Sequence, residues 1–163
     1  MDEQFREYVA ARTESLRFTA YLLTGDWHLA EDIVQTSLVK LYRVWHRIER
    51  GGSIDAYVRR IITRTFLNER RRAWWRREHV TDAPPEPAPP PASGPEDRML
   101  VWAALKRVPR KQRAALVLRY WEDLSLAEAA EVLGCSEGTV KSQCSRGLRT
   151  LREVLERDAV VGR

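Results

Sequence analysis

Apolar side chains recur at helical spacing along the N-terminal half of the chain. The clearest stripe advances by three or four residues at most steps and consists of Val34, Leu38, Leu41, Tyr42 and Trp45. Shorter stripes run from Phe5 to Leu16 and from Val58 to Thr65, and the breaks between the stripes are Gly25-Asp26 and Gly51-Gly52-Ser53. No run of alternating apolar and polar residues is long enough to predict a strand, so we expect an all-α fold.

The C-terminal half has the pattern of a helix-turn-helix. Ser125 suits an N-cap, and the apolar residues of the following segment LAEAAEVL have the spacing of one helical face. Gly134-Cys135-Ser136 then supplies a glycine to end that helix and a serine to cap the next one. A longer helix is predicted from Glu137 to Glu156. A short helix, a three-residue turn and a longer helix therefore follow one another.

The two faces of this longer helix differ in chemistry. One arc is apolar and contains Val140, Cys144, Leu148, Leu151 and Leu155. The opposite arc is cationic and hydrogen-bonding and contains Lys141, Ser142, Ser145, Arg146 and Arg149. Short polar side chains and basic groups near a helix start can reach base edges and phosphates in a major groove. A solvated helix face is the alternative, but it more often mixes acids with bases, so we favour DNA reading.

Seven of the eight prolines lie in one stretch, TDAPPEPAPPPASGPED, at residues 81–97. The stretch holds four acids and no lysine or arginine, and its apolar content is nearly all alanine. This composition predicts an extended, flexible linker that buries no core. We therefore expect two small helical domains, at residues 1–80 and 98–163, joined by an acidic, proline-rich linker at residues 81–97.

Positive charge is concentrated just before the linker. Eight arginines and one acid lie between Arg59 and Arg77, and the aromatic residues beside them are Tyr57, Phe66, Trp74 and Trp75. Guanidinium groups pair with phosphates and rings stack on unpaired bases, so this surface suits a nucleic-acid strand. The alternative is a solvated helix end with two tryptophans packed on the core. The whole chain carries a net charge of +5, which fits a polyanionic partner.

Composition excludes several classes of protein. No apolar run is long enough for a membrane span, and the charged first residues contain no signal-peptide core, so we expect a cytoplasmic protein without membrane insertion. Cys135 and Cys144 have no histidine nearby, which predicts neither a metal site nor a disulfide scaffold. The chain has no motif for cofactor or phosphate binding, so no cofactor, small-molecule substrate or catalytic residue is predicted.

Two other classes compete with a two-domain DNA-binding protein. A conventional regulator would use the helix-turn-helix alone, and the basic, aromatic surface of the N-terminal half would then be unexplained. An enzyme acting on nucleic acid needs metal-binding carboxylates, a nucleophile with its base, or a phosphate loop. Asp26, Glu31 and Asp32 form the one tight acidic group of the first domain, and we interpret them as a helix start and a partner-facing surface. We therefore do not expect an enzyme.

Three segments together resemble one protein family. They are GDWHLAEDIVQTSLVKLYRVW, SIDAYVRRIITRTFLNERRR and VPRKQRAALVLRYWEDLSLAEAAEVLGCSEGTVKSQCSRGLRTLR. With them the chain resembles, from Phe5 to Leu155, the extracytoplasmic-function (group 4) sigma factors of the actinobacterial SigE-like type. The resemblance implies a sigma factor that binds bacterial core RNA polymerase and directs promoter-specific transcription initiation. Its region-2-like bundle would recognise and melt the −10 element, and its region-4-like helix-turn-helix would read the −35 element.

The resemblance assigns roles to residues of the first domain. The helix that docks on the largest polymerase subunit is matched by Asp32, Val34, Gln35 and Leu38. The segment WHRIERGGS matches the loop that captures a flipped −10 base, and the next helix lies near the opened strand. The candidates for −10 recognition are His46, Arg47, Ile48, Arg50, Tyr57, Arg60, Arg64 and Asn68. Relatives often have an acid at the position of Thr36 and asparagine at that of Arg64.

In the second domain the resemblance places the cationic arc of the longer helix at the −35 element. The residues concerned are Arg119, Lys141, Ser142, Gln143, Ser145, Arg146 and Arg149. Arg119 precedes the helix-turn-helix and matches a phosphate-contacting position. Many relatives have arginine where this chain has Gln143, at the edge of the arc, so Gln143 reads a flanking base or none.

The resemblance also implies partners beyond promoter DNA and core polymerase. An anti-sigma protein would mask the polymerase-binding or DNA-binding faces. In this family the linker threads through polymerase toward the active-site cleft and the RNA exit path, where an acidic chain would mimic RNA; a passive spacer is the open alternative. The proline-rich linker predicts that the two domains have no fixed arrangement until a partner orders them.

Overall fold

The computed structural model describes residues 2–48, 53–68 and 95–161. Within these ranges every regular element is helical and no strand occurs, which confirms the expected all-α class. The chain divides into two compact units, one within Met1–Ala83 and one within Pro84–Arg163. None of the described helices combines the length and the apolar character needed to cross a membrane. Arg50, the segment 70–77 and residues 81–94 of the predicted linker lie outside the described residues.

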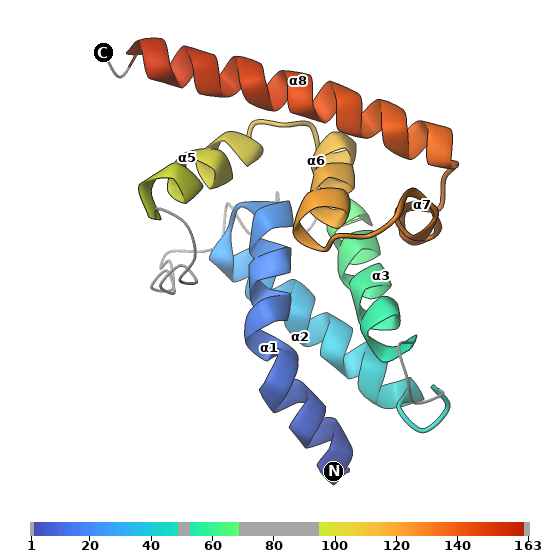
Figure 1. The fold of residues 1–163 in the computed structure, drawn as a ribbon. Helices are drawn as coiled ribbons and strands as arrows, with labels where there is room; N and C mark the ends of the chain where they lie inside the picture. The colour runs from blue at the N-terminus through green and yellow to red at the C-terminus, as the bar shows by residue number, and fades with distance from the viewer. Residues whose placement is uncertain (1, 49–52, 69–94, 162–163) are drawn as a thin grey trace. The chain divides into compact units, whose positions relative to one another are not determined.

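The described part of the first unit is a bundle of three helices, coloured blue to green in Figure 1. Helix α1 spans Glu3–Thr24, α2 spans Trp27–Val44 and α3 spans Ser53–Asn68. Each of the three helices packs against the other two. Gly25 ends α1 in the left-handed conformation with a φ of 69°, and the Asp26 carboxylate caps α2 by accepting from the N–H groups of His28 and Leu29. The break predicted at Gly25-Asp26 is confirmed.

The buried face of α2 is rotated from the predicted stripe. Leu41 and Trp45 are buried as expected, but Tyr42 is 44% exposed. The centre of the buried face includes Ser37, which is fully buried and donates to the carbonyl of Ile33 at 2.6 Å. A serine can occupy the core here because its hydroxyl is satisfied by its own helix. Apolar spacing alone therefore indicated the helix but not the exact side that packs on α1 and α3.

The second unit is built on one long helix. It contains α5 (Pro95–Leu105), α6 (Arg110–Leu116), the π-helical turn η1 (Val117–Trp121), α7 (Leu126–Leu133) and α8 (Glu137–Val161). Figure 1 shows α8, in orange to red, lying along one side of α5, α6 and α7, and it packs against all three. Cys144, on the packed side of α8, is buried as the helical wheel predicted.

Helix α5 begins inside the stretch predicted as a linker. Pro95 occupies its first position, and the acids Glu96 and Asp97 lie in its first turn. Proline needs no hydrogen-bond partner at a helix start, and acids there are stabilised by the helix dipole. Residues 95–97, which the composition assigned to the linker, are therefore helical, and the bounds of the linker stay a prediction.

The helix-turn-helix is confirmed in detail. The Ser125 hydroxyl accepts from the Glu128 N–H at 3.1 Å, and the Glu128 carboxylate accepts from the Ser125 N–H at 3.0 Å, which together form a capping box at α7. Gly134 ends α7 in the left-handed conformation with a φ of 68°. The Ser136 hydroxyl then accepts from the Thr139 N–H at 3.1 Å and caps α8. These local bonds set the angle at which α8 leaves the turn.

One prediction about apolar faces in this unit was wrong. Leu148 was expected in the buried arc of α8, but it is 40% exposed, while Gly147 next to it is buried. Two large aromatic side chains, Tyr120 and Trp121, are also exposed. They belong to the π-helical turn η1, where the Glu122 N–H bonds to the carbonyl of Val117. The extra residue in this wider turn rotates the chain after Leu118 away from the core.

Candidate nucleic-acid and polymerase interface

The outer face of α8 gathers the polar residues that the sequence placed on one arc. The exposed members are Lys141, Ser142, Ser145, Arg146 and Arg149, and Gln143 at the edge is half-buried. On the opposite side Val140 is fully buried, and burial raises the pKa of the Cys144 thiol, which remains a neutral core group. The packed side therefore holds α8 in place while the cationic side stays accessible.

The charge on this face of α8 has one sign over four turns. Residues 138–152 contain one lysine and three arginines and no acid. The helix N-terminus contributes partial positive charge as well. A surface with hydroxyls between cations matches the phosphates and base edges of a duplex groove.

Arg119 lies just before the helix-turn-helix and is half-buried. One of its guanidinium nitrogens, Nη1, donates to the carbonyl of Leu124. This bond spans the turn that contains Asp123, a non-glycine residue with a φ of 55°. This bond therefore stabilises the segment before α7 and fixes the orientation of the Arg119 guanidinium. A phosphate contact by Arg119 would be made in that orientation.

The four residues matched to the polymerase-docking helix differ in exposure. Val34 is 2% exposed, Asp32 and Leu38 are half-buried, and Gln35 is exposed. Val34 packs inside the bundle, as its place in the apolar stripe predicted. On the same face as Gln35, Val39 is 54% exposed and Tyr42 is 44% exposed. Val39 lies outside the apolar stripe, which was the sequence signal for its exposure.

The candidate −10 residues occupy the end of α2 and one side of α3. His46 and Arg47 are exposed and Ile48 is half-buried, in the turn that leaves α2. The backbone N–H groups of Arg47 and Ile48 both donate to the carbonyl of Val44, at 2.9 and 3.1 Å. These bonds fold the start of the loop back against the helix end.

The α3 candidates share one side of their helix. Tyr57 and Arg60 are half-buried, and Arg64 and Asn68 are exposed. The opposite side of α3 packs on the bundle through Val58, Ile62 and Phe66, all of them buried. A cationic ridge with an aromatic ring at its start therefore faces away from the core, as binding to a single strand requires.

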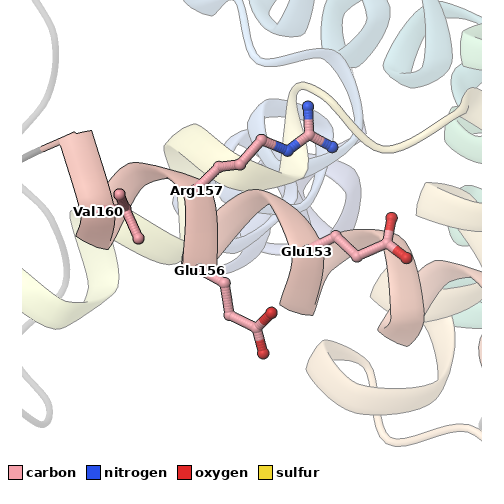
Figure 2. A pocket seen from close by; sticks show the side chains of 4 residues that line it. All are labelled: Glu153, Glu156, Arg157 and Val160. Atoms are coloured by element: carbon pink, nitrogen blue, oxygen red, sulfur yellow. The ribbon is translucent and has the colours of Figure 1, made fainter.

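A pocket in the described ranges lies farther along α8 than the cationic face. This pocket, on the last turns of α8, is lined by Glu153, Glu156, Arg157 and Val160. Figure 2 shows Arg157 and Glu156 pointing in opposite directions from the helix, so the four side chains do not converge on one point. No three acidic, histidine or cysteine side chains of the described residues gather as a metal ion requires.

Two family models match the chain. Sigma-70 region 2 matches residues 9–76, and Sigma-70, region 4 matches residues 98–151. The RNA polymerase sigma-E factor of Streptomyces coelicolor is 40% identical over 157 residues, which cover 93% of this chain and 86% of that protein. The ECF RNA polymerase sigma factor SigL of Mycobacterium tuberculosis is 33% identical over 147 residues, which cover 84% of this chain and 80% of that protein.

A solved structure has the same fold. The sigma factor RpoE of Bartonella quintana, crystallised with the anti-sigma factor NepR, is 27% identical with a TM-score of 0.74, over 95% of this chain and 98% of that chain. The resemblance found in the three sequence segments is thus confirmed. The chain belongs to the extracytoplasmic-function group of RNA polymerase sigma factors, with sigma-70 regions 2 and 4, and it acts in promoter-specific transcription initiation as a transcription regulator rather than a catalytic enzyme.

Proposed function

We propose that three described surfaces divide the work of this sigma factor. The outer face of α8 reads the −35 element, the turn after α2 together with the outer side of α3 binds the opened −10 strand, and the exposed face of α2 docks on core RNA polymerase. In this assignment a region-2-like domain comprises residues 1–80 and a region-4-like domain follows the linker, with Pro95 rather than residue 98 as its first helical residue.

The acid-free, exposed face of α8 is the observation that carries the proposal. Lys141 and Arg146 lie five residues apart on that face, and both are exposed. Their spacing suits contacts in a major groove entered by the N-terminal half of the helix. Ser142 and Ser145, also exposed, supply short hydrogen-bonding groups to base edges. Arg149, farther along, suits a phosphate contact at the rim of the groove.

Run-off transcription with sigma-free bacterial core polymerase tests the −35 assignment. The template is the DNA upstream of the gene that encodes this chain. We expect specific initiation with the wild type and a loss of about tenfold or more with Lys141→Ala/Arg146→Ala, because each base or phosphate contact contributes 1 kcal/mol or more, in order of magnitude.

A matched control removes equal charge elsewhere in the same unit. Lys111→Ala/Arg157→Ala, at two exposed positions on α6 and on the last turns of α8, should leave initiation close to wild type. Equal losses in both double variants would mean that net charge alone matters and that α8 reads no −35 element. If core polymerase never binds the protein while the protein alone protects DNA from cleavage, the conventional-regulator alternative holds.

Docking on polymerase is assigned to Gln35, Val39 and Tyr42. Exposed apolar side chains beside a polar one are typical of the centre of a protein interface. We expect Val39→Asp to weaken binding to core polymerase by about tenfold, because the new carboxylate would lose its water in the complex. The dissociation constant of the complex, measured by fluorescence anisotropy, checks this.

Val160→Asp is the control for polymerase binding, because Val160 is 72% exposed and lies on α8. It introduces the same charge at another open valine and should leave the dissociation constant unchanged. If Val39→Asp also leaves it unchanged, the exposed face of α2 does not dock on polymerase.

An anti-sigma protein is the regulator we propose for this chain. The support is the Bartonella quintana RpoE structure, in which a sigma factor of the same fold is bound to the anti-sigma factor NepR. The proposed site of action is the cytoplasm, where core polymerase and promoter DNA are found.

A further inference from the structure

One face of α1 touches both ends of the segment that connects α2 with α3. At the α2 end, Phe5 packs edge-on against Tyr42 and Trp45, with ring centroids 5.0 and 5.3 Å apart. The carboxylate of Asp2, which caps α1, lies 3.8 Å from Nδ1 of His46. Ring packing therefore holds the C-terminal end of α2 against the first turn of α1.

Tyr8, one turn farther along α1, contacts both ends of the same segment. Its ring centroid lies 5.7 Å from that of Trp45, where α2 ends. Its hydroxyl donates to Oδ1 of Asp55 at 2.8 Å, in the first turn of α3. Burial, and then the bond to Asp55, raise the pKa of the Tyr8 hydroxyl, so it remains a protonated donor.

Two interactions hold the Asp55 carboxylate, and the hydrogen bond from the Tyr8 hydroxyl is the stronger of them. Arg12 also approaches this carboxylate, with Nε 3.2 Å from Oδ1, but more than a third of each charged side chain is exposed. Ion pairs this open to water contribute little. A part-buried hydrogen bond to a carboxylate contributes more and has a defined direction.

We propose that Tyr8 is a positioning residue for −10 recognition, which rests on the proposed function of the turn after α2 and of α3. By holding Trp45 and Asp55 at once, Tyr8 fixes the turn that carries His46, Arg47 and Ile48 relative to the first turn of α3. Side chains that are held in place beforehand lose less conformational freedom when they bind a base. Tyr8 therefore raises both the affinity and the base selectivity of this surface without contacting DNA.

Tyr8→Phe tests this inference, because it removes the hydroxyl and keeps the ring against Trp45. The assay uses holoenzyme and a fluorescent single-stranded oligonucleotide from the −10 region of a promoter at which the wild type initiates. A second set of oligonucleotides carries each base replaced in turn. We expect about tenfold weaker binding of the native oligonucleotide by Tyr8→Phe, and little change for the oligonucleotide with the flipped base replaced. The selectivity ratio, which is the affinity for the native oligonucleotide divided by that for the replaced one, therefore falls.

Tyr21→Phe is the matched control. Tyr21 lies on the same helix, close to its C-terminal end. Its ring is stacked on that of Trp27 at the start of α2, with ring centroids 4.0 Å apart. Its loss of a hydroxyl should leave the selectivity ratio and the affinity for core polymerase unchanged. Tyr8→Phe should also leave the affinity for core polymerase unchanged, which a general loss of structure would not do.

Asp55→Ala provides a second test by a double-mutant cycle. If the hydroxyl acts through Asp55, Tyr8→Phe has no further effect on oligonucleotide binding once Asp55 is gone. An unchanged selectivity ratio in Tyr8→Phe, with wild-type holoenzyme binding normally, overturns the positioning role and leaves the proposed function intact. Failure of the wild-type holoenzyme to discriminate between the oligonucleotides contradicts the −10 assignment itself.

Discussion

Gly147→Val is expected to lower the free energy of unfolding of the C-terminal unit by about 3 kcal/mol. A Cβ atom at Gly147 would lie 2.9 Å from Cδ1 of Leu116 and 3.3 Å from the backbone carbonyl oxygen of Gln112. Leu116 is itself buried, so α6 and α8 would have to separate. Amide hydrogen exchange in α6 and α8 should accelerate about a hundredfold, with α1 of the other unit as the internal reference.

Gly138→Val is the control for the loss of a glycine from the same helix. A Cβ at Gly138 meets only the hydroxyl of Ser136, at 3.8 Å, so the change should stay within about 0.5 kcal/mol. If the amides of α6 and α8 exchange at the same rate in Gly147→Val as in Gly138→Val, the close approach of the two helices does not stabilise this unit. Because α6 supports the packed side of α8, Gly147→Val should also reduce run-off transcription that depends on the −35 element.

Arg113→Met is expected to cost a similar amount, about 3 kcal/mol, by a different route. The Arg113 side chain is 8% exposed, and its guanidinium donates to two backbone carbonyls in the turn between α5 and α6. Nη2 lies 2.8 Å from the carbonyl oxygen of Val108 and 2.9 Å from that of Lys106. Methionine fills much of the same volume but leaves both carbonyls without these donors. Urea unfolding of the full chain measures the loss in free energy of unfolding, and hydrogen exchange in α5 and α6 shows where in the chain it occurs.

The charge of Arg113 persists in spite of its burial. Burial, with a smaller contribution from Arg110, lowers the pKa of Arg113 to about 10, which still leaves the guanidinium protonated at neutral pH. Arg113→Lys should recover only part of the stability, because an ammonium group cannot reproduce the planar fork. Arg157→Met, at an exposed position on α8, should have no effect. Equal stability of Arg113→Met and Arg157→Met would show that hydrogen bonds from a guanidinium to the carbonyls of Lys106 and Val108 do not stabilise the protein.

The helix ends that carry a local cap were predictable, because the partners in a cap are close together in the sequence. Asp26 and Ser125 cap the helices that follow them with their own side chains, and Gly134 supplies a conformation that few other residues adopt readily. These interactions involve residues at most four positions apart, so the sequence contains all the partners. The helix-turn-helix and the cationic face of α8 could be predicted for the same reason.

Packed faces were predicted less well, because small residues mark the points of closest approach. Ser37 and Gly147 are buried where neighbouring helices meet, yet neither adds to an apolar stripe. Conversely, Leu148 and Tyr42 extend their stripes and remain exposed. Apolar periodicity locates a helix and its approximate inner side. The exact centre of that side depends on which helices lie against it.

The sequence by itself determined the helical class, the caps, the helix-turn-helix and the cationic chemistry of the outer side of α8, since each depends on residues close together in the chain. Only the tertiary structure decided that Ser37 is internal, that Arg113 holds a turn by its carbonyls, and that Tyr8 bonds to Asp55. Tyr8 and Asp55 are 47 positions apart. Their contact exists because α1 packs on both α2 and α3, and a pairing of that kind follows from the packing of whole helices rather than from local spacing.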